Sequence, residues 1–415
     1  MIAEILSTGD EIRSGSLVDS NSAWLSRKLE ERGITVSRHS CVGDDIPMLV
    51  SVFREIGARA HIAMVTGGLG PTTDDLSAEA AGKAAGLPLL LNETALCTVR
   101  KYFSSRNREM PASNRKQAML PRGADMLPNS AGTAPGFAMQ IGKCRFFFMP
   151  GVPSEMRRMF REQVLPRLEE MQGDNREIHQ IQSISTFGMP ESAVGELVKD
   201  LPDIFPHIRL GLRAKFPEIQ IRLYGRHDSR VRLQKEMEAA QTWVREKMGT
   251  RVFSGRGESM EAVVGRLLRE KNATLALAES CTGGLIASRI TDVAGSSEYF
   301  LFSAVTYSNE AKMRVLGVKS ETLEQYGAVS EETVKEMAEG AGKLADADYG
   351  IATSGIAGPD GGSEEKPVGT LCVGLAGPDG IKSFRFLMKF ADRSMNKSMF
   401  AMKALDLLRM ELINT

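Results

Sequence analysis

Short apolar runs and longer amphipathic stretches follow one another along the first 170 residues. The runs IAEILS, ITVSRHSCV and HIAMVTGG predict strands, and GFAMQIG and KCRFFFM, joined at Gly142, predict a hairpin on the same sheet. Amphipathic stretches predict helices at 21–32, 46–58, 76–85, 93–105 and 156–171. This βα order predicts a three-layer α/β domain over residues 1–172.

The pattern changes after residue 177. IQSISTF, IRLGLRA and EIQIRLYG predict strands, and 191–199 and 229–248 predict helices, which gives a small α+β module at 177–253. From 257 to 413 the βα style returns, with strands at TLALAE, YFLFSAVTY, YGIATS, VGTLCVGLAG and IKSFRFLMKF. Helices are predicted there at 260–271 and 393–411. The chain is therefore predicted to be an α/β protein of three domains.

The composition of the chain disfavours several classes of partner and site. The chain has 415 residues with 52 Lys+Arg and 52 Asp+Glu, so its formal net charge of +0 does not favour nucleic acid as a partner. No run approaches the roughly 18 apolar residues of a membrane helix, and the first ten residues lack a basic export signal, so we expect a cytoplasmic protein. The five Cys form no CxxC pair and the five His form no HxxxH pair, which disfavours disulfides and a His-based metal centre.

The loop TGGLGPTTDD follows a predicted strand and precedes a predicted helix. Its backbone N–H groups can approach an anion there, so Gly67, Gly68, Gly70 and Thr72 are candidate phosphate contacts. The loop matches neither GxGxxG nor GxxxxGK[ST]. The alternative is a turn in which Asp75 caps the helix.

Acidic residues follow the first predicted strand. Asp10, Glu11 and Asp19 lie at its carboxyl end, where open α/β sheets bind ligands. Carboxylates in that place suit Mg²⁺ shared with substrate phosphates, although Asp19 could equally cap the next helix. In SNRKQA, Lys116 could pair with phosphate or lie in solvent.

TLALAESCTGG predicts a strand that ends at Glu279 and turns through Gly283 into a helix. A nucleophile at such a turn is accessible, and nearby N–H groups can form an oxyanion hole. Ser280 and Cys281 are the candidates, and a helix-capping serine is the alternative. No His follows His227, which excludes a Cys–His pair or a Ser–His–Asp triad within this domain.

A serine nucleophile would therefore need another base. VTYSNEAK supplies Tyr307 and Lys312. A lysine acts as a base only if burial or a nearby cation lowers its pKa, so we expect Lys312 to be buried near Ser280, with Cys281 in a packing role.

Two further segments supply candidate substrate contacts. IATSGIAGPDGG predicts a strand that enters a Gly-Pro loop at Thr353, Ser354 and Gly355. FADRSMNKS places Arg393 at the start of the last helix, where phosphate binding and a surface salt bridge are both open.

STGDEI, VGDD, GGLGPTTDD, SNRKQA, GTAPGF and FFMPGVPSEM resemble, in this order, the N-terminal domain of the competence/damage-inducible CinA family. That domain is similar to the molybdopterin-binding fold of molybdenum-cofactor synthesis proteins. Two aspartates matter in those proteins, and the matching positions in this chain are Asp44 and Asp75. The resemblance implies ADP-ribose pyrophosphatase activity with a divalent metal such as Mg²⁺. A pterin- or nucleotide-binding module without turnover is the alternative, since the chain has no Nudix pattern. The metal ligands would be Asp10, Glu11, Asp44 and Asp75.

ESCTGGLIA, GSSEYF, VTYSNEAK, SGIAGPDGG and KPVGT resemble the C-terminal CinA domain. The resemblance implies deamidation of nicotinamide mononucleotide to nicotinate mononucleotide and ammonia, without a cofactor. Ser280 would be the nucleophile and Lys312 the base, with Tyr307 beside it. The residues that would hold substrate are Glu279, Thr282, Gly283, Thr353, Ser354, Gly355 and Arg393. Ser354 departs from the commoner threonine.

TFGMPESAVGEL is similar to the KH-like connecting domain of long CinA chains. A KH domain clamps RNA with a GXXG loop, and no such loop occurs between Pro190 and Ile208. We therefore expect a spacer, and regard a competence protein linked to nucleic acid as the third hypothesis. The expected partners are small-molecule nucleotides and a second copy of the chain in a homodimer.

Overall fold

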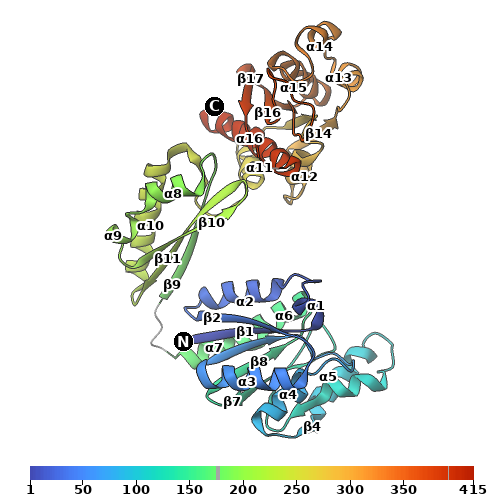
Figure 1. Cartoon of the computed structure of the whole chain (residues 1–415), viewed down its shortest axis with the longest axis vertical. Coiled ribbons are helices and arrows are strands. Elements are labelled where there is room, and N and C mark those ends of the chain that lie inside the picture. Colours follow the sequence, from blue (N-terminus) through green and yellow to red (C-terminus); the bar gives the residue numbers. More distant parts are fainter. Residues whose placement is uncertain (174–177, 391) are drawn as a thin grey trace. The chain divides into compact units, whose positions relative to one another are not determined.

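The computed structural model describes residues 1–173, 178–390 and 392–415 (Figure 1). The described chain divides into two compact units, residues 1–180 with 225–234 and residues 181–224 with 235–415. The boundary predicted between 172 and 177 falls largely on residues 174–177, outside the described residues, so the three-domain division stays a prediction. Within the described residues, no helix is both long and apolar enough to cross a bilayer.

The N-terminal domain has a mixed six-stranded sheet in the order β2-β1-β3-β8-β7-β6, and a two-stranded sheet pairs β4 with β5. Its strands are β1 (Ile2–Thr8), β2 (Thr35–Val42), β3 (Ile62–Thr66), β4 (Leu89–Leu91), β5 (Met119–Pro121), β6 (Asp125–Leu127), β7 (Gly136–Ile141) and β8 (Cys144–Met149). Its helices are α1 (Asp10–Arg13), α2 (Ser20–Glu30), α3 (Ile46–Arg59), α4 (Ser77–Ala85), α5 (Glu93–Ser104), η1 (Ala112–Ala118), α6 (Pro153–Met159), η2 (Phe160–Val164) and α7 (Leu165–Gln172).

Alternation along the central strands builds two cores on opposite faces of this sheet. Val65 and Phe148 belong to the core that α3, α4 and α5 cover, whereas Met64 and Phe147 belong to the core that α2, α6 and α7 cover. Because both faces are covered, β3 is buried along its whole length. The predicted three-layer domain is therefore confirmed.

The helix predicted at 156–171 is interrupted. Residues 160–164 form a π-helical turn between α6 and α7. Pro166 lies just beyond it, and a proline has no N–H to donate to the preceding turn. The wider turn accommodates that missing hydrogen bond.

The middle module has a four-stranded sheet in the order β10-β11-β9-β12. Its elements are β9 (Ile178–Thr186), α8 (Glu191–Val198), α9 (Leu201–Ile204), β10 (Ile208–Lys215), β11 (Glu218–His227), α10 (Arg230–Met248), η3 (Gly249–Arg251) and β12 (Val252–Ser254).

The C-terminal domain has a five-stranded sheet in the order β14-β13-β15-β16-β17. Its strands are β13 (Leu275–Glu279), β14 (Phe300–Val305), β15 (Tyr349–Gly355), β16 (Thr370–Gly377) and β17 (Gly380–Leu387). Its helices are α11 (Met260–Glu270), α12 (Leu285–Thr291), η4 (Ser296–Glu298), α13 (Asn309–Leu316), α14 (Ser320–Tyr326), α15 (Glu331–Ala345) and α16 (Arg393–Asn414).

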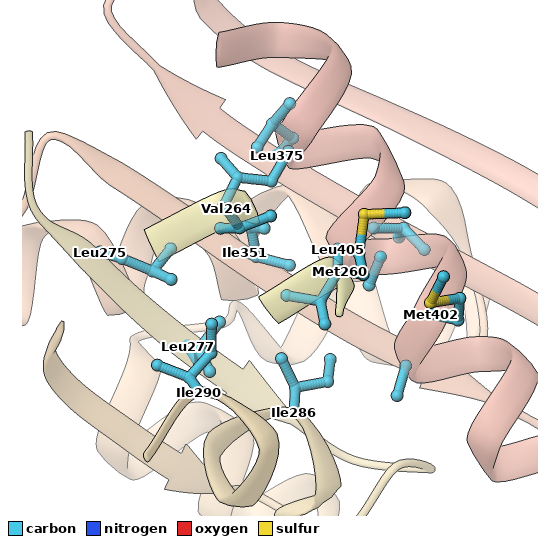
Figure 2. Packing of buried hydrophobic residues seen from close by; sticks show 14 of the residues in the cluster. Met260, Val264, Leu275, Leu277, Ile286, Ile290, Ile351, Leu375, Met402 and Leu405 are labelled. Carbon is cyan, nitrogen blue, oxygen red and sulfur yellow. The ribbon is translucent and has the colours of Figure 1, made fainter. Parts of the chain in front are cut away.

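Helices cover both faces of this sheet as well. Leu275 and Leu277 of β13 point into the core formed with α11, α12 and α16 (Figure 2). Ala276 and Ala278 point the other way, toward α13, α14 and α15. The small alanines let helices approach that face closely. Every residue of β13 is buried, so the strand is held between two cores.

Candidate active site

Ser280 directly follows β13, in the middle of the C-terminal sheet. In the parallel register, Glu279 lies opposite Val305 of β14 and Thr353 of β15. The carboxyl ends of three neighbouring strands therefore meet beside Ser280, whose N–H donates to the Thr353 carbonyl at 3.0 Å. Ser280 itself is 9% exposed.

Lys312 lies on α13 and is buried, with 1% of its surface exposed. Its Nζ lies 3.3 Å from Ser280 Oγ, 2.9 Å from the Thr306 carbonyl and 3.3 Å from the Tyr307 carbonyl. Burial lowers the pKa of Lys312. The predicted juxtaposition of Ser280 and Lys312 is therefore present in the structure.

The three contacts of Lys312 suit a neutral amine. Such an amine has two N–H donors, which match the two carbonyls, and one lone pair, which can accept the Ser280 hydroxyl proton. Thr306 contributes a second feature, because its buried Oγ1 has no hydrogen-bond partner among the described residues. Lys312 Nζ thus lies among the oxygen atoms of Ser280, Thr306 and Tyr307.

Cys281 packs into the core of the domain instead of facing the serine. It is 5% exposed, and burial raises the pKa of its thiol to about 12. A thiol with that pKa is protonated at neutral pH and is a poor nucleophile. The packing role expected for Cys281 agrees with this position.

Glu279, a predicted substrate contact, has partners within the protein. The side chain is fully buried, and its two carboxylate oxygens accept the N–H groups of Ile286 at 3.1 Å and Ala287 at 2.8 Å. These donors are free N–H groups of the first turn of α12, so Glu279 anchors that helix. Each carboxylate oxygen thus has a backbone partner, and the substrate contact of Glu279 stays a prediction.

The other predicted side chains on β15 also make internal contacts. The Thr282 and Thr353 hydroxyls are 2.8 Å apart and fully buried, and the Ser354 hydroxyl donates to the Ala328 carbonyl at 2.6 Å. At Gly355 a Cβ would come within 2.5 Å of the Thr370 carbonyl. These side chains are hydrogen-bonded within the protein, and the contacts of Thr282, Thr353 and Ser354 with substrate stay predictions.

Tyr307 and Arg393 form a separate, exposed pair. Arg393 Nη2 donates to the Tyr307 hydroxyl at 3.0 Å, and Nη1 donates to the Gly358 carbonyl at 2.6 Å. Tyr307 is 63% exposed. Among the described residues, no hydrogen bond joins the Tyr307 hydroxyl to Ser280 or Lys312, so only the backbone of Tyr307 contacts the lysine.

Most of the predicted residues of the N-terminal domain line one cavity of about 530 Å³, whereas Asp10, Thr72 and Lys116 do not. The ends of β1 and β3 form its floor, and the turn at Gly67 (φ +100°) and Gly68 (φ +66°) forms one wall. A Cβ at Gly67 would lie 2.5 Å from the Thr8 carbonyl, so glycine is required there. The acidic side chains that line this cavity are Glu11, Asp19, Asp44, Asp74, Asp75 and Glu155.

The four predicted metal ligands do not form one cluster. Asp10 pairs with Arg13 at 3.0 Å, and Asp75 accepts the Thr72 N–H at 2.9 Å within the turn. Asp75 does not cap the following helix α4, whose N-cap residue is Leu76 and which has no side-chain cap. Within the described chain, no three His, Cys, Asp or Glu side chains lie close enough to hold an ion. Glu11 and Asp44 face the cavity, and burial together with the neighbouring acids raises the pKa of Asp44.

Two other predicted residues also have internal partners. Asp19 caps α2 by accepting the Ser22 N–H at 2.9 Å. Lys116 donates to the Thr72 carbonyl and borders a smaller neighbouring cavity that also touches Gly70. Thr72 and Lys116 thus contact each other and do not line the larger cavity with its acidic side chains, which we call the acidic cavity.

Comparison with known proteins decides the family. Three family models match the chain in order, described as "Probable molybdopterin binding domain" at residues 4–170, "Damage-inducible protein CinA KH domain" at 182–254 and "CinA C-terminal domain" at 257–412. A CinA-like protein of Desulfosudis oleivorans is 51% identical over 414 residues, which cover 100% of both chains. The chain belongs to the CinA family.

Other CinA relatives agree. A CinA-like protein of Geobacter metallireducens is 41% identical over 414 residues, with 100% of both chains covered. The crystal structure of competence/damage inducible protein CihA from Agrobacterium tumefaciens shares 36% identity and covers 38% of this chain and 97% of that chain, with a TM-score of 0.36. The three family models and the full-length relatives confirm the CinA recognition, and the helix-covered sheets confirm the α/β fold class predicted from the sequence.

The structure adds two residues of α16 to the CinA site. Lys397 lies one helical turn after Arg393, and its Nζ comes within 3.4 Å of the position that a Cβ would take at Gly283. Asn396 is buried and joins the Ala357 carbonyl at 3.0 Å to the Phe390 N–H at 2.9 Å. The i, i+4 spacing of Arg393 and Lys397 at a helix start is the sequence signal that could have indicated this face.

Proposed function

We propose that the C-terminal domain of this CinA-family protein is an amide hydrolase that deamidates nicotinamide mononucleotide. The observation that carries the proposal is the 3.3 Å contact between Ser280 Oγ and the buried Lys312 Nζ at the end of three strands. Burial lowers the pKa of that lysine, as a base near neutral pH requires. Membership of the CinA family supports a hydrolase of this kind.

The first half of the reaction follows from these positions. Ser280 Oγ attacks the amide carbonyl carbon of the nicotinamide while its proton moves to Lys312 Nζ. The carbonyl π electrons move to oxygen, where the N–H groups of the turn can stabilise the charge. In the described chain, the N–H groups of Thr282 and Gly284 donate to no protein acceptor, so they are available for this role.

The second half releases both products. Lys312 returns its proton to the amide nitrogen as the C–N bond breaks, and ammonia leaves behind an ester on Ser280. Water then attacks the ester carbon, with Lys312 again taking a proton and passing it to Ser280 Oγ as the C–O bond breaks. Nicotinate mononucleotide is released and the enzyme returns to its starting state.

The nucleotide phosphate would bind the cationic face of α16. Arg393 and Lys397 lie one turn apart at the start of this helix, and the Tyr307 hydroxyl already accepts a hydrogen bond from Arg393. An arginine guanidinium and a lysine ammonium are common phosphate partners. Tyr307 is thus proposed as a binding residue beside Arg393, not as a base.

The proposal is tested by ammonia release from nicotinamide mononucleotide. We expect Ser280→Ala and Lys312→Ala each to lower turnover by at least about a thousandfold, and the double variant to lose little more, because the two side chains act as one unit. Cys281→Ala is the matched control and should stay within about tenfold of wild type. An inactive Cys281→Ala beside an active Ser280→Ala would refute the serine–lysine mechanism.

We further propose that the N-terminal domain hydrolyses ADP-ribose with a divalent cation. The acidic cavity favours this, since its lining holds six carboxylates and, among the described residues, no lysine or arginine. A pyrophosphate could enter such a cavity only with a cation that balances its charge. Glu11 and Asp44 have free access to that cation, and substrate oxygens would complete its ligands, as Mg²⁺ sites commonly require. The cation would polarise the pyrophosphate for attack by water.

The test compares two aspartates. With Mg²⁺ present, Asp44→Asn should abolish release of monophosphates from ADP-ribose, whereas Asp75→Asn should retain part of it, because Asp75 holds the turn through Thr72. If Asp44→Asn bound ADP-ribose and wild type showed no metal-dependent turnover, a binding module without catalysis would be favoured instead. The expected homodimer and nucleotide partners stay predictions.

A further inference from the structure

A second cavity, with a mainly apolar lining that includes four phenylalanines, lies inside the unit 181–224 with 235–415. It measures about 520 Å³, and its walls come from the middle module and from β17 and α16 of the C-terminal domain. Phe187 and Phe216 line one side, and Phe386 and Phe390 line the other. We call it the aromatic cavity. Its size suits a small organic molecule.

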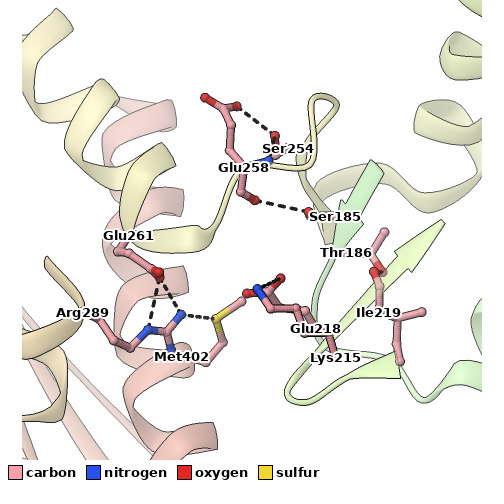
Figure 3. Close-up of polar contacts among 10 residues, drawn as sticks. All are labelled: Ser185, Thr186, Lys215, Glu218, Ile219, Ser254, Glu258, Glu261, Arg289 and Met402. Atoms are coloured by element: carbon pink, nitrogen blue, oxygen red, sulfur yellow. Dashed lines mark hydrogen bonds and ion pairs between the residues drawn. The ribbon is translucent and has the colours of Figure 1, made fainter. Parts of the chain in front are cut away.

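Two charged side chains, Glu218 and Lys403, interrupt this apolar lining. Glu218 borders the aromatic cavity and is 4% exposed, and its Oε2 accepts no hydrogen bond from the described residues. Lys215 Nζ lies 4.0 Å away, at the outer limit of an ion pair, and its side chain is 54% exposed (Figure 3). A buried carboxylate oxygen without a hydrogen bond is destabilising unless a ligand satisfies it.

The other charged groups near Glu218 already have partners. Arg289 donates twice to Glu261 Oε2, at 3.1 and 2.7 Å (Figure 3). Lys403 lies 3.5 Å from Asp406 and stacks its ammonium over the Phe386 ring at 4.9 Å. Glu218 is therefore the charge in this cavity whose compensation is weakest, which favours a cationic ligand.

We propose that the aromatic cavity binds a small aromatic cation, with its positive group on Glu218 and its ring among the four phenylalanines. Ring faces attract cations, and a carboxylate in an apolar wall strengthens that preference. Lys403 also lines the cavity, but its charge is balanced by Asp406 at 3.5 Å, and the side chain of Lys215 is 54% exposed. The site is separate from Ser280 and does not depend on the proposed deamidation.

Calorimetric titration of the full chain with 2-phenylethylammonium, 2-phenylethanol and phenylacetate tests the proposal. The three probes share a ring and differ in charge. We expect the cation to bind at least about tenfold more tightly than the alcohol, a difference of about 1.4 kcal/mol, and the anion to bind least. Tighter binding of phenylacetate, or no binding of any probe, would overturn the proposal.

Variants locate the binding. Glu218→Gln should bring the affinity for the cation down to that for the alcohol, while Glu310→Gln, an exposed control on α13, should change nothing. Phe216→Ala, at a ring that is 43% exposed and tolerant of replacement, should weaken both probes. Asp44→Asn tests whether the cation binds in the acidic N-terminal cavity instead. If Asp44→Asn rather than Glu218→Gln abolished binding of the cation, the aromatic cavity would not be its site.

Discussion

The chemistry proposed for the C-terminal domain depends on the protonation of a single residue. Lys312 is buried, and its Nζ contacts one hydroxyl and two carbonyls, with no carboxylate among its hydrogen-bond partners in the described chain. Burial without an opposite charge disfavours the ammonium form, which explains the lowered pKa of this lysine. When the two N–H groups of the neutral amine donate to the two carbonyls, its lone pair is free to accept the Ser280 hydroxyl proton.

The pH dependence of deamidation follows from that lowered pKa. The active form is the neutral amine, so turnover should fall as pH drops through the pKa of Lys312, which lies below the usual value of about 10.4. Lys312→Arg keeps the charge and donors but cannot lose its proton, so it should be inactive at every pH. Steady-state rates of ammonia release across pH measure both. A wild-type profile without an acid limb would contradict the role of Lys312 as base.

The free energy of unfolding should also depend on pH through Lys312. The unfolded chain binds more protons than the folded chain between the lowered pKa and about 10.4, so the free energy of unfolding should rise with pH across that window. Lys312→Met should remove this rise. Urea unfolding at several pH values compares the two slopes, and equal slopes would show that burial does not shift this lysine.

At the scale of an element, the turn between β13 and α12 positions the nucleophile. Glu279 anchors α12 through two backbone N–H groups, while Gly283 (φ +61°) and Gly284 (φ +86°) adopt left-handed conformations that other residues avoid. The turn is therefore fixed from both ends, and Ser280 is held at its start.

Glu279→Gln tests this anchoring. The amide loses one acceptor and faces a backbone N–H with its own donor, so we expect about 1–3 kcal/mol lower free energy of unfolding in urea. The exposed Glu310→Gln should stay within about 0.5 kcal/mol of wild type. Lost activity with unchanged stability would instead support the substrate contact that the sequence predicted for Glu279.

Much of the fold could be predicted because its signals are local. The buried strands β3, β8, β13 and β15 have strong apolar runs, and the turn after β13 has two glycines. The short β6 (Asp125–Leu127) has no such run and was not predicted. The prediction missed α15, although Val334, Met337, Ala338 and Ala341 show helical spacing. The roles of Glu279 and Ser354 could not be predicted, since their partners at Ile286 and Ala328 are defined only by tertiary packing. Lys312 was predictable because the sequence offers no His after His227.

At the scale of the molecule, the unit 181–224 with 235–415 joins the middle module to the C-terminal domain through a shared core. Phe187 and Phe253 are each 6% exposed and belong to the same cluster as the core of β13. The buried Arg409 donates to the Thr250 carbonyl at 2.9 Å, and the Ser185 hydroxyl donates to the Glu258 carbonyl at 3.2 Å (Figure 3). The middle module is thus a structural support for the domain that carries Ser280.

Two fragments of the chain test the structural support from the middle module separately from the catalysis in the C-terminal domain. Ser280, Lys312 and Arg393 all lie after residue 257, so fragments 181–415 and 257–415 should both deamidate nicotinamide mononucleotide. The shorter fragment exposes the surface that Phe187 and Phe253 cover and leaves Arg409 without its carbonyl, so its free energy of unfolding should be lower by several kcal/mol. Equal stability would show that the shared core contributes nothing. If both fragments were folded yet inactive, residues before 181 would have to contribute to the site, and the Ser280–Lys312 pair would not be sufficient.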